Sequence, residues 1–234
     1  IRFTEEAQIT AQLEHPNIVT AYEMGLDDKG RLFYTMKMVK GRNLKEILRL
    51  IKKKDEDTLR KFPLSRLLEI FTAVCDAMSY ACSKKIVHRD LKPDNIMVGD
   101  YGEVYIVDWG LAKIIKSNSS SSTEQIPEWI VKEVYEKKDL STDKFLKELR
   151  RIDSLRTKDE NLNISFNDVL IGTPQYMAPE RISGDADECS EVYALGAILY
   201  NILTLELTVK GDNLEEIVTK IFNEDIKSPL KFNK

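Results

Sequence analysis

Hydrophobic and polar positions follow two different patterns in the first forty residues of the chain. Over residues 4–13 the apolar side chains recur at helical spacing, which predicts a helix that ends before Pro16. Residues 18–24 and 32–39 are instead rich in β-forming side chains, and an Asp/Gly turn signal separates them. The pattern therefore predicts a helix followed by two antiparallel strands, the second of which ends at Gly41.

Helical spacing returns after these strands. Residues 44–51 are amphipathic, and the lysine-rich stretch that follows them is expected to be solvated. Ser65 is predicted to cap a longer, buried helix. The apolar positions that repeat helically along it are Leu68, Phe71, Val74, Cys75, Met78 and Ala81. Residues 193–207 are apolar on nearly every side, which predicts a central buried helix.

A β-hairpin is predicted between the two long helices. Residues 96–98 and 104–107 are apolar runs, and a turn signal with two glycines separates them. Asn95 stands directly before the first run and Asp108 directly after the second. The hairpin is therefore expected to bring these two side chains together.

A segment at about 114–171 looks inserted into this framework. It opens with a tract of serine and asparagine over residues 117–122, which is too polar to order itself. The remainder of the segment carries dense charges of both signs. The pattern therefore leaves helical structure open in this part of the chain.

Composition limits the classes of protein that fit. The 234 residues are 42% hydrophobic, which is enough to bury a core in one domain or two small lobes. A net charge of −4 provides no basic face, so no nucleic-acid partner is expected. Three cysteines without CxxC spacing suggest buried thiols in a reducing compartment, and the expected location is cytoplasmic. No apolar run is long enough to predict a membrane segment within this chain.

Residues 88–95 carry the strongest chemical signal, with the sequence His-Arg-Asp-Leu-Lys-Pro-Asp-Asn. Asp90 can accept the proton of an attacking hydroxyl group, and Lys92 can neutralise charge on a phosphoryl group that is being transferred. Asn95 can hold a metal ion by its side-chain oxygen. A solvated polar turn is the alternative interpretation, but the combination of residue types favours phosphoryl transfer.

Two further motifs follow in order, namely Asp-Trp-Gly at residues 108–110 and Gly-Thr-Pro-Gln-Tyr-Met-Ala-Pro-Glu at residues 172–180. Together with residues 88–95 they resemble the catalytic half of protein kinases, whose order is H-R-D, D-F-G and A-P-E. The likeness is greatest to bacterial eukaryotic-like (Hanks-type) Ser/Thr protein kinases of the PknD type. It implies an α+β fold in which a small β-rich lobe precedes a mainly helical lobe.

The resemblance implies specific roles in catalysis. Asp90 is similar to the catalytic base, and Lys92 to the phosphate-facing lysine that accompanies Ser/Thr substrates. Asn95 and Asp108 resemble the pair of metal ligands, which implies Mg²⁺. Thr173 matches the threonine of the substrate-docking loop, where its hydroxyl contacts the catalytic aspartate and lysine; a structural cap is the alternative.

The resemblance also implies an ATP site. Met36 stands at the gatekeeper position, and residues 37–39, from Lys37 to Val39, occupy the hinge whose backbone contacts adenine. Met97 resembles a residue beneath the adenine ring. Without the family match, Met36 would be interpreted as an ordinary core residue.

Glu6 keeps the spacing of the family's glutamate that pairs with an ATP-orienting lysine, although one charge on a solvated helix face is the simpler interpretation. The chain starts at Ile1, so we expect that lysine and the glycine-rich loop to be missing from it. The expected organisation is a partial N-lobe at 1–40 and a C-lobe at 41–234 that is truncated at its end. Glu191 occupies the place of an aspartate that holds the catalytic loop, and the longer side chain must shift to do so.

The leading hypothesis is a protein kinase that transfers the γ-phosphoryl group of ATP to Ser or Thr hydroxyls of proteins. The expected partners are protein substrates and a second copy of the chain for trans-autophosphorylation. One alternative is a pseudokinase or scaffold that uses the kinase fold for binding. A phosphotransferase that acts on small molecules is a more remote alternative, because the Ala-Pro-Glu motif argues against it.

Overall fold

The computed structural model describes residues 9–114, 174–182, 188–211, 216–217, 220–221 and 226–232. Its strands are β1 (Ala21–Leu26), β2 (Leu32–Met36), β3 (Gly41–Asn43), β4 (Ile86–Val87), β5 (Ile96–Gly99), β6 (Val104–Ile106) and β7 (Lys113–Ile114). Its α-helices are α2 (Leu44–Lys52), α3 (Glu56–Lys61), α4 (Leu64–Ser83), α8 (Pro179–Ile182) and α9 (Glu188–Thr204). Three short 3-10 helices are η1 (Pro93–Asn95), η2 (Pro174–Tyr176) and η3 (Pro229–Lys231).

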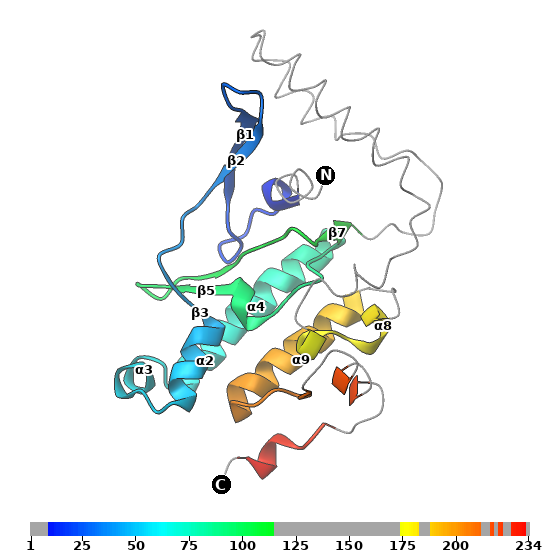
Figure 1. Ribbon diagram of the computed structural model, residues 1–234. Coiled ribbons are helices and arrows are strands. Elements are labelled where there is room, and N and C mark those ends of the chain that lie inside the picture. Colours follow the sequence, from blue (N-terminus) through cyan, green and yellow to red (C-terminus); the bar gives the residue numbers. More distant parts are fainter. Residues whose placement is uncertain are drawn as a thin grey trace.

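The predicted strands near the N-terminus form an antiparallel hairpin of β1 and β2, which confirms that prediction. Gly30 has a φ of 75° in the connecting turn, a conformation that glycine adopts at little cost. The second strand ends at Met36, and Gly41 begins β3 instead, so the predicted end at Gly41 is wrong. Figure 1 shows the hairpin projecting away from α2, α4 and α9.

A second sheet has the strand order β3-β5-β6, and all its pairs are antiparallel. Its β5–β6 pair is the predicted hairpin, which is confirmed. The chain just before β1 runs along β6, because Ile106 donates its N–H to the carbonyl of Asn17 at 2.8 Å and accepts from the N–H of Val19 at 3.1 Å. These bonds attach the N-terminal segment to the sheet that carries the candidate site.

The helix predicted at 44–51 is confirmed as α2, which Asn43 caps by accepting from the Glu46 N–H at 2.8 Å. The lysine-rich stretch after it is mostly exposed, as expected. It nevertheless forms α3, which the hydrophobic pattern did not predict. Asp55 caps this helix by accepting from the Thr58 N–H at 2.9 Å.

The long helix α4 is confirmed, but Ser65 does not cap it. The cap position is Pro63, which has extended φ and ψ and forms no side-chain cap, so the helix begins at Leu64. The buried face differs from the predicted one, because Leu68 is 37% exposed. The face toward the core consists of Leu67, Ile70, Val74, Ala77, Met78 and Ala81.

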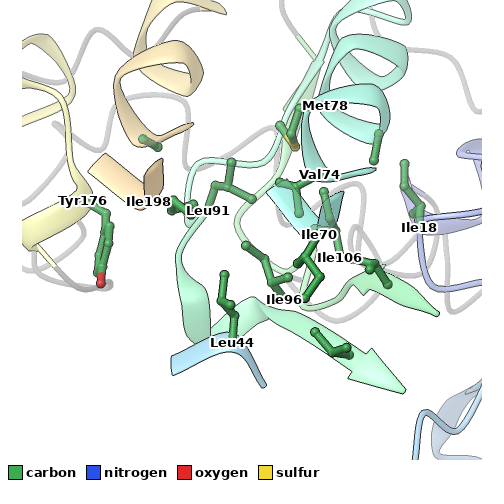
Figure 2. Packing of buried hydrophobic residues seen from close by; sticks show 14 of the residues in the cluster. Ile18, Leu44, Ile70, Val74, Met78, Leu91, Ile96, Ile106, Tyr176 and Ile198 are labelled. Carbon is green, nitrogen blue, oxygen red and sulfur yellow. The ribbon is translucent and has the colours of Figure 1, made fainter. Parts of the chain in front are cut away.

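One continuous hydrophobic cluster joins α4, α9 and the β5–β6 hairpin (Figure 2). The apolar helix predicted at 193–207 is confirmed as α9, although it begins earlier in the chain. Ile9, Leu13 and Ile18 belong to the same cluster, so residues on both sides of position 40 share a core. The division at position 40 stays a prediction.

All three cysteines lie within the described ranges and form no disulfide. The prediction of buried thiols is wrong for Cys189, which is exposed, while Cys75 and Cys82 are half-buried. No helix in these ranges combines the length and the apolar character of a membrane span.

Candidate active site

The motif at residues 88–95 forms a loop between β4 and β5 that ends in η1. Arg89 has a φ of 67°, so the chain turns sharply just before Asp90. His88 and Asp90 are both buried, at 0% and 8% exposure. The loop is thus a constrained part of the fold and not the solvated polar turn of the alternative interpretation.

The Asp90 carboxylate is held by Lys92 and Asn95 of the same motif. Its Oδ2 accepts a hydrogen bond from Lys92 Nζ at 2.6 Å and a second from Asn95 Nδ2 at 3.2 Å. Asn95 Nδ2 also donates to the backbone carbonyl of Asp90 at 2.9 Å. Asp90 Oδ1 accepts no bond from the described residues, so it is available to accept the proton of a hydroxyl group.

His88 ties this loop to the segment after β6. Its Nδ1 accepts the Asp90 N–H at 3.2 Å, and its Nε2 lies 3.1 Å from the carbonyl of Val107. Because an imidazole that both accepts and donates is neutral, these contacts identify the Nε2–H tautomer. Burial lowers the pKa of His88, which agrees with a neutral ring. The indole of Trp109 packs on this ring with centroids 4.6 Å apart.

Glu191 on α9 binds the backbone of this loop. Its Oε1 accepts the Arg89 N–H at 2.7 Å, so the longer side chain does reach the loop backbone. Its Oε2 is buried and has no hydrogen-bond partner in the described part of the chain. One oxygen of Glu191 therefore fixes the turn at Arg89 while the other does not contribute a bond.

Two half-buried arginine side chains lie near this carboxylate. Burial lowers the pKa of Arg89, and the negative charge of Glu191 opposes that effect. Burial likewise lowers the pKa of Arg181, where the charges of Asp90 and Glu191 act in the opposite direction. The cluster thus contains two cations and two carboxylates, and Glu191 partly compensates both cations.

Asp108 lies two residues after the end of β6 and is exposed, with a φ of 62°. The Val107 N–H donates to the Asn95 carbonyl at 2.9 Å, so the chain segments that carry Asp108 and Asn95 lie side by side. Their carboxylate and carboxamide oxygens are hard ligands of the kind that Mg²⁺ prefers. The described residues contain no group of three or more His, Cys, Asp and Glu side chains suited to a metal. The donor set nevertheless fits Mg²⁺, which takes few protein ligands and retains waters and phosphate oxygens.

The predicted adenine-contacting residues lie around the β5–β6 hairpin. Met36 ends β2 and is 40% exposed, so it is not a buried core residue. Met97 on β5 is half-buried and pairs with Tyr105 on β6. Lys37 donates to the Tyr105 hydroxyl, and Val39 packs against the main core. Tyr105 was not predicted from the sequence, in which a hydroxyl within an apolar strand was its one signal.

The motif at residues 172–180 is fastened to α9 and to the chain that follows it. The Tyr176 hydroxyl donates to Asn201 Oδ1 at 3.1 Å, and the Thr208 hydroxyl donates to the Gln175 carbonyl at 3.2 Å. Burial raises the pKa of Tyr176. Thr173, Glu6 and the predicted insertion beyond Ile114 lie outside the described residues.

Comparisons with known proteins agree with these motifs. Residues 1–145 match the family model described as the protein kinase domain. The chain is 36% identical over 98% of its length to the serine/threonine-protein kinase PknD of Protochlamydia amoebophila (strain UWE25). It is 34% identical over 97% of its length to the PknD of Chlamydia felis (strain Fe/C-56). It spans 21% and 22% of the lengths of these two relatives. On this match and these identities, the chain belongs to the protein kinase domain family.

Proposed function

We propose that the protein containing this chain is an ATP- and Mg²⁺-dependent kinase that phosphorylates Ser or Thr hydroxyls of proteins. The observation that carries the proposal is the carboxylate of Asp90, whose Oδ2 is held by Lys92 and Asn95 while Oδ1 accepts no bond from the described residues. A general base needs this combination of fixed position and available lone pair. The relatives named above are both called serine/threonine-protein kinases, which supports the same reaction.

The roles of the other residues follow from their chemistry. Asp90 orients the acceptor hydroxyl and takes its proton, and Lys92 offsets negative charge on the transferred group. Asn95 and Asp108 would hold Mg²⁺, which supplies further neutralisation of the phosphate charge when it is bound. We assign to Thr173 a contact with Asp90 and Lys92 that aligns the acceptor.

The nucleotide site in this proposal lies between the segment after β2 and Met97. Within the described residues, no hydrogen bond involves the backbone N–H or C=O groups of Met38 or Val39. Backbone groups without a partner are available to bind the polar edge of adenine, which supports this location. Glu6 would pair with a lysine of the longer protein to orient the ATP phosphates.

The proposal extends to partners and location. The expected substrates are proteins that present a Ser or Thr hydroxyl, and a second copy of the kinase would be one of them during trans-autophosphorylation. Three cysteines without disulfides suit a reducing compartment such as the cytoplasm.

The experiment uses the longest native protein that contains this chain, with Mg²⁺ and ATP labelled on its γ-phosphate. We expect label on Ser or Thr of protein acceptors, and a loss of about 10²–10⁴-fold in Asp90→Asn because the base is removed. Asp100→Asn, in the exposed turn after β5, is the control and should retain full activity. Equal labelling by wild type and Asp90→Asn would refute the proposed kinase activity. Nucleotide binding without transfer would then identify a pseudokinase, and transfer to small molecules alone would identify a different phosphotransferase.

A further inference from the structure

The chain between β2 and β3, residues 37–40, is fastened at both ends to the β5–β6 hairpin. At its start, Lys37 donates its backbone N–H to the Thr20 carbonyl at 2.9 Å and its ammonium to the Tyr105 hydroxyl on β6. At its end, the Lys40 carbonyl accepts the Asp100 N–H at 3.2 Å, and β3 then pairs with β5. The hairpin therefore sets the position of the whole segment.

Tyr105 is well suited to hold the Lys37 ammonium. The tyrosine is 8% exposed, so its ring is fixed by the sheet and by its neighbours. Lys37 Nζ lies 4.4 Å from the centroid of this ring, so the ring face attracts the cation in addition to the hydroxyl. The hydrogen bond to Tyr105 raises the pKa of Lys37, which keeps the amine charged.

The side chains on either side of Lys37 add little further anchorage. Met36 and Met38 are 40% and 80% exposed, so their side chains contribute little packing that could fix the segment. Between the two anchors lie the backbone groups of Met38 and Val39 that have no partner in the described ranges. The contact between Lys37 and Tyr105 is the side-chain anchor at the start of this segment, and it acts together with the backbone bonds of Lys37 and Lys40.

The same tyrosine is also in register with the other side of the proposed nucleotide site. Tyr105 pairs directly with Met97 across β5 and β6. A single residue thus contacts the hinge through Lys37 and lies beside the residue proposed to contact the adenine ring. The position of Tyr105 therefore links the position of the hinge, residues 37–39, to the position of Met97.

We infer that Tyr105, through Lys37, is a positioning residue that sets the adenine-binding hinge relative to Met97. This inference rests on the proposed function, since it assumes that residues 37–39 bind the nucleotide base. Loss of the tether leaves the hinge with more conformations, and the base must then order it on binding. We expect weaker binding of the base and no change in binding of the phosphates, which other residues contact.

The test measures dissociation constants of the native protein for two probes, adenosine and Mg²⁺-tripolyphosphate. Tyr105→Phe removes the hydroxyl and keeps the ring, while Lys37→Met removes the ammonium and keeps an apolar stem of similar length. We expect each variant to weaken adenosine binding about 3–10-fold, the range for loss of one typical hydrogen bond. The dissociation constant for Mg²⁺-tripolyphosphate should change by less than about 2-fold. The double variant should be no weaker than the worse single variant, because both remove one interaction.

Tyr101→Phe is the matched control, since Tyr101 is 98% exposed in the turn of the same hairpin and should bind both probes as wild type. Unchanged adenosine binding in Tyr105→Phe would overturn the inference, and so would equal weakening of both probes, which indicates general damage. If Tyr105→Phe fails to fold, Lys37→Met decides by the same criteria. Failure of wild type to bind adenosine would instead refute the proposed nucleotide site.

Discussion

The proximity of polar residues within one short motif could be predicted from the sequence alone. Asp90, Lys92 and Asn95 are close in the chain, so the spacing of their residue types already indicates their chemistry, and the structure brings them together. Tyr105 could not be found in this way. Its contact with Lys37 joins residues 68 positions apart, and no local pattern encodes a contact across that separation.

The negative charge of Glu191 is expected to stabilise the folded protein. Glu191→Gln keeps an oxygen that can accept the Arg89 N–H but removes the negative charge that compensates the half-buried cations of Arg89 and Arg181. We expect the free energy of unfolding to fall by about 1–3 kcal/mol, the range for hydrogen bonds to charged groups and unpaired buried groups. Urea unfolding followed by circular dichroism measures this change.

Glu188→Gln on the same helix is the control for this measurement. Glu188 pairs with Lys85 at 2.9 Å, but both side chains are largely exposed, and such pairs contribute little. A Glu191→Gln protein that unfolds at the same urea concentration as Glu188→Gln and wild type would show that the carboxylate does not stabilise the cluster.

At the scale of elements, the sequence predicted type and order better than it predicted orientation and boundaries. The period of α4 was correct, yet Leu68 is exposed because the direction of the core depends on where α9 and β6 pack. The helix α3 was missed because it is short and largely exposed, so it lacks a hydrophobic period. Its signal was the capping residue Asp55, which the hydrophobic pattern ignores.

Two glycines, Gly41 and Gly196, differ in how much space their surroundings leave for a side chain. Gly41 begins β3 with a φ of 151°, and a Cβ there would lie 2.1 Å from the Val98 carbonyl oxygen. Gly196 lies within α9, and a Cβ there would meet nothing within 4 Å. Gly41→Ala should destabilise the protein by about 1–3 kcal/mol through backbone displacement. Gly196→Ala should stabilise it by about 0.5–1 kcal/mol through lower chain entropy in the unfolded state.

Thermal unfolding of the two variants measures these opposite effects, and each variant serves as the control for the other. Because β3 follows the hinge directly, Gly41→Ala should also weaken adenosine binding, whereas Gly196→Ala should leave it unchanged. Destabilisation of similar size in both variants would contradict the pairing of β3 with β5 that the structure describes.

At the scale of the whole molecule, stability is expected to be unevenly distributed. The main hydrophobic cluster includes residues from the N-terminal segment, α4, β5, β6 and α9, but none of the described side chains of the β1–β2 hairpin. Sequence patterns predicted both the hairpin and the longer helices α4 and α9, but they could not show which elements share a core. That property depends on packing between segments far apart in the chain.

Amide hydrogen exchange should reveal this uneven distribution. Core amides such as those of Val74, Ile106 and Ile198, whose side chains are fully buried, should exchange on the order of 100-fold more slowly than those of β1 and β2. Low concentrations of urea should accelerate exchange in the core, because it requires an opening that exposes much surface, and should barely affect the hairpin, which opens locally. Equal rates and equal urea dependence in the two regions would show that the hairpin belongs to the same cooperative unit as α4 and α9.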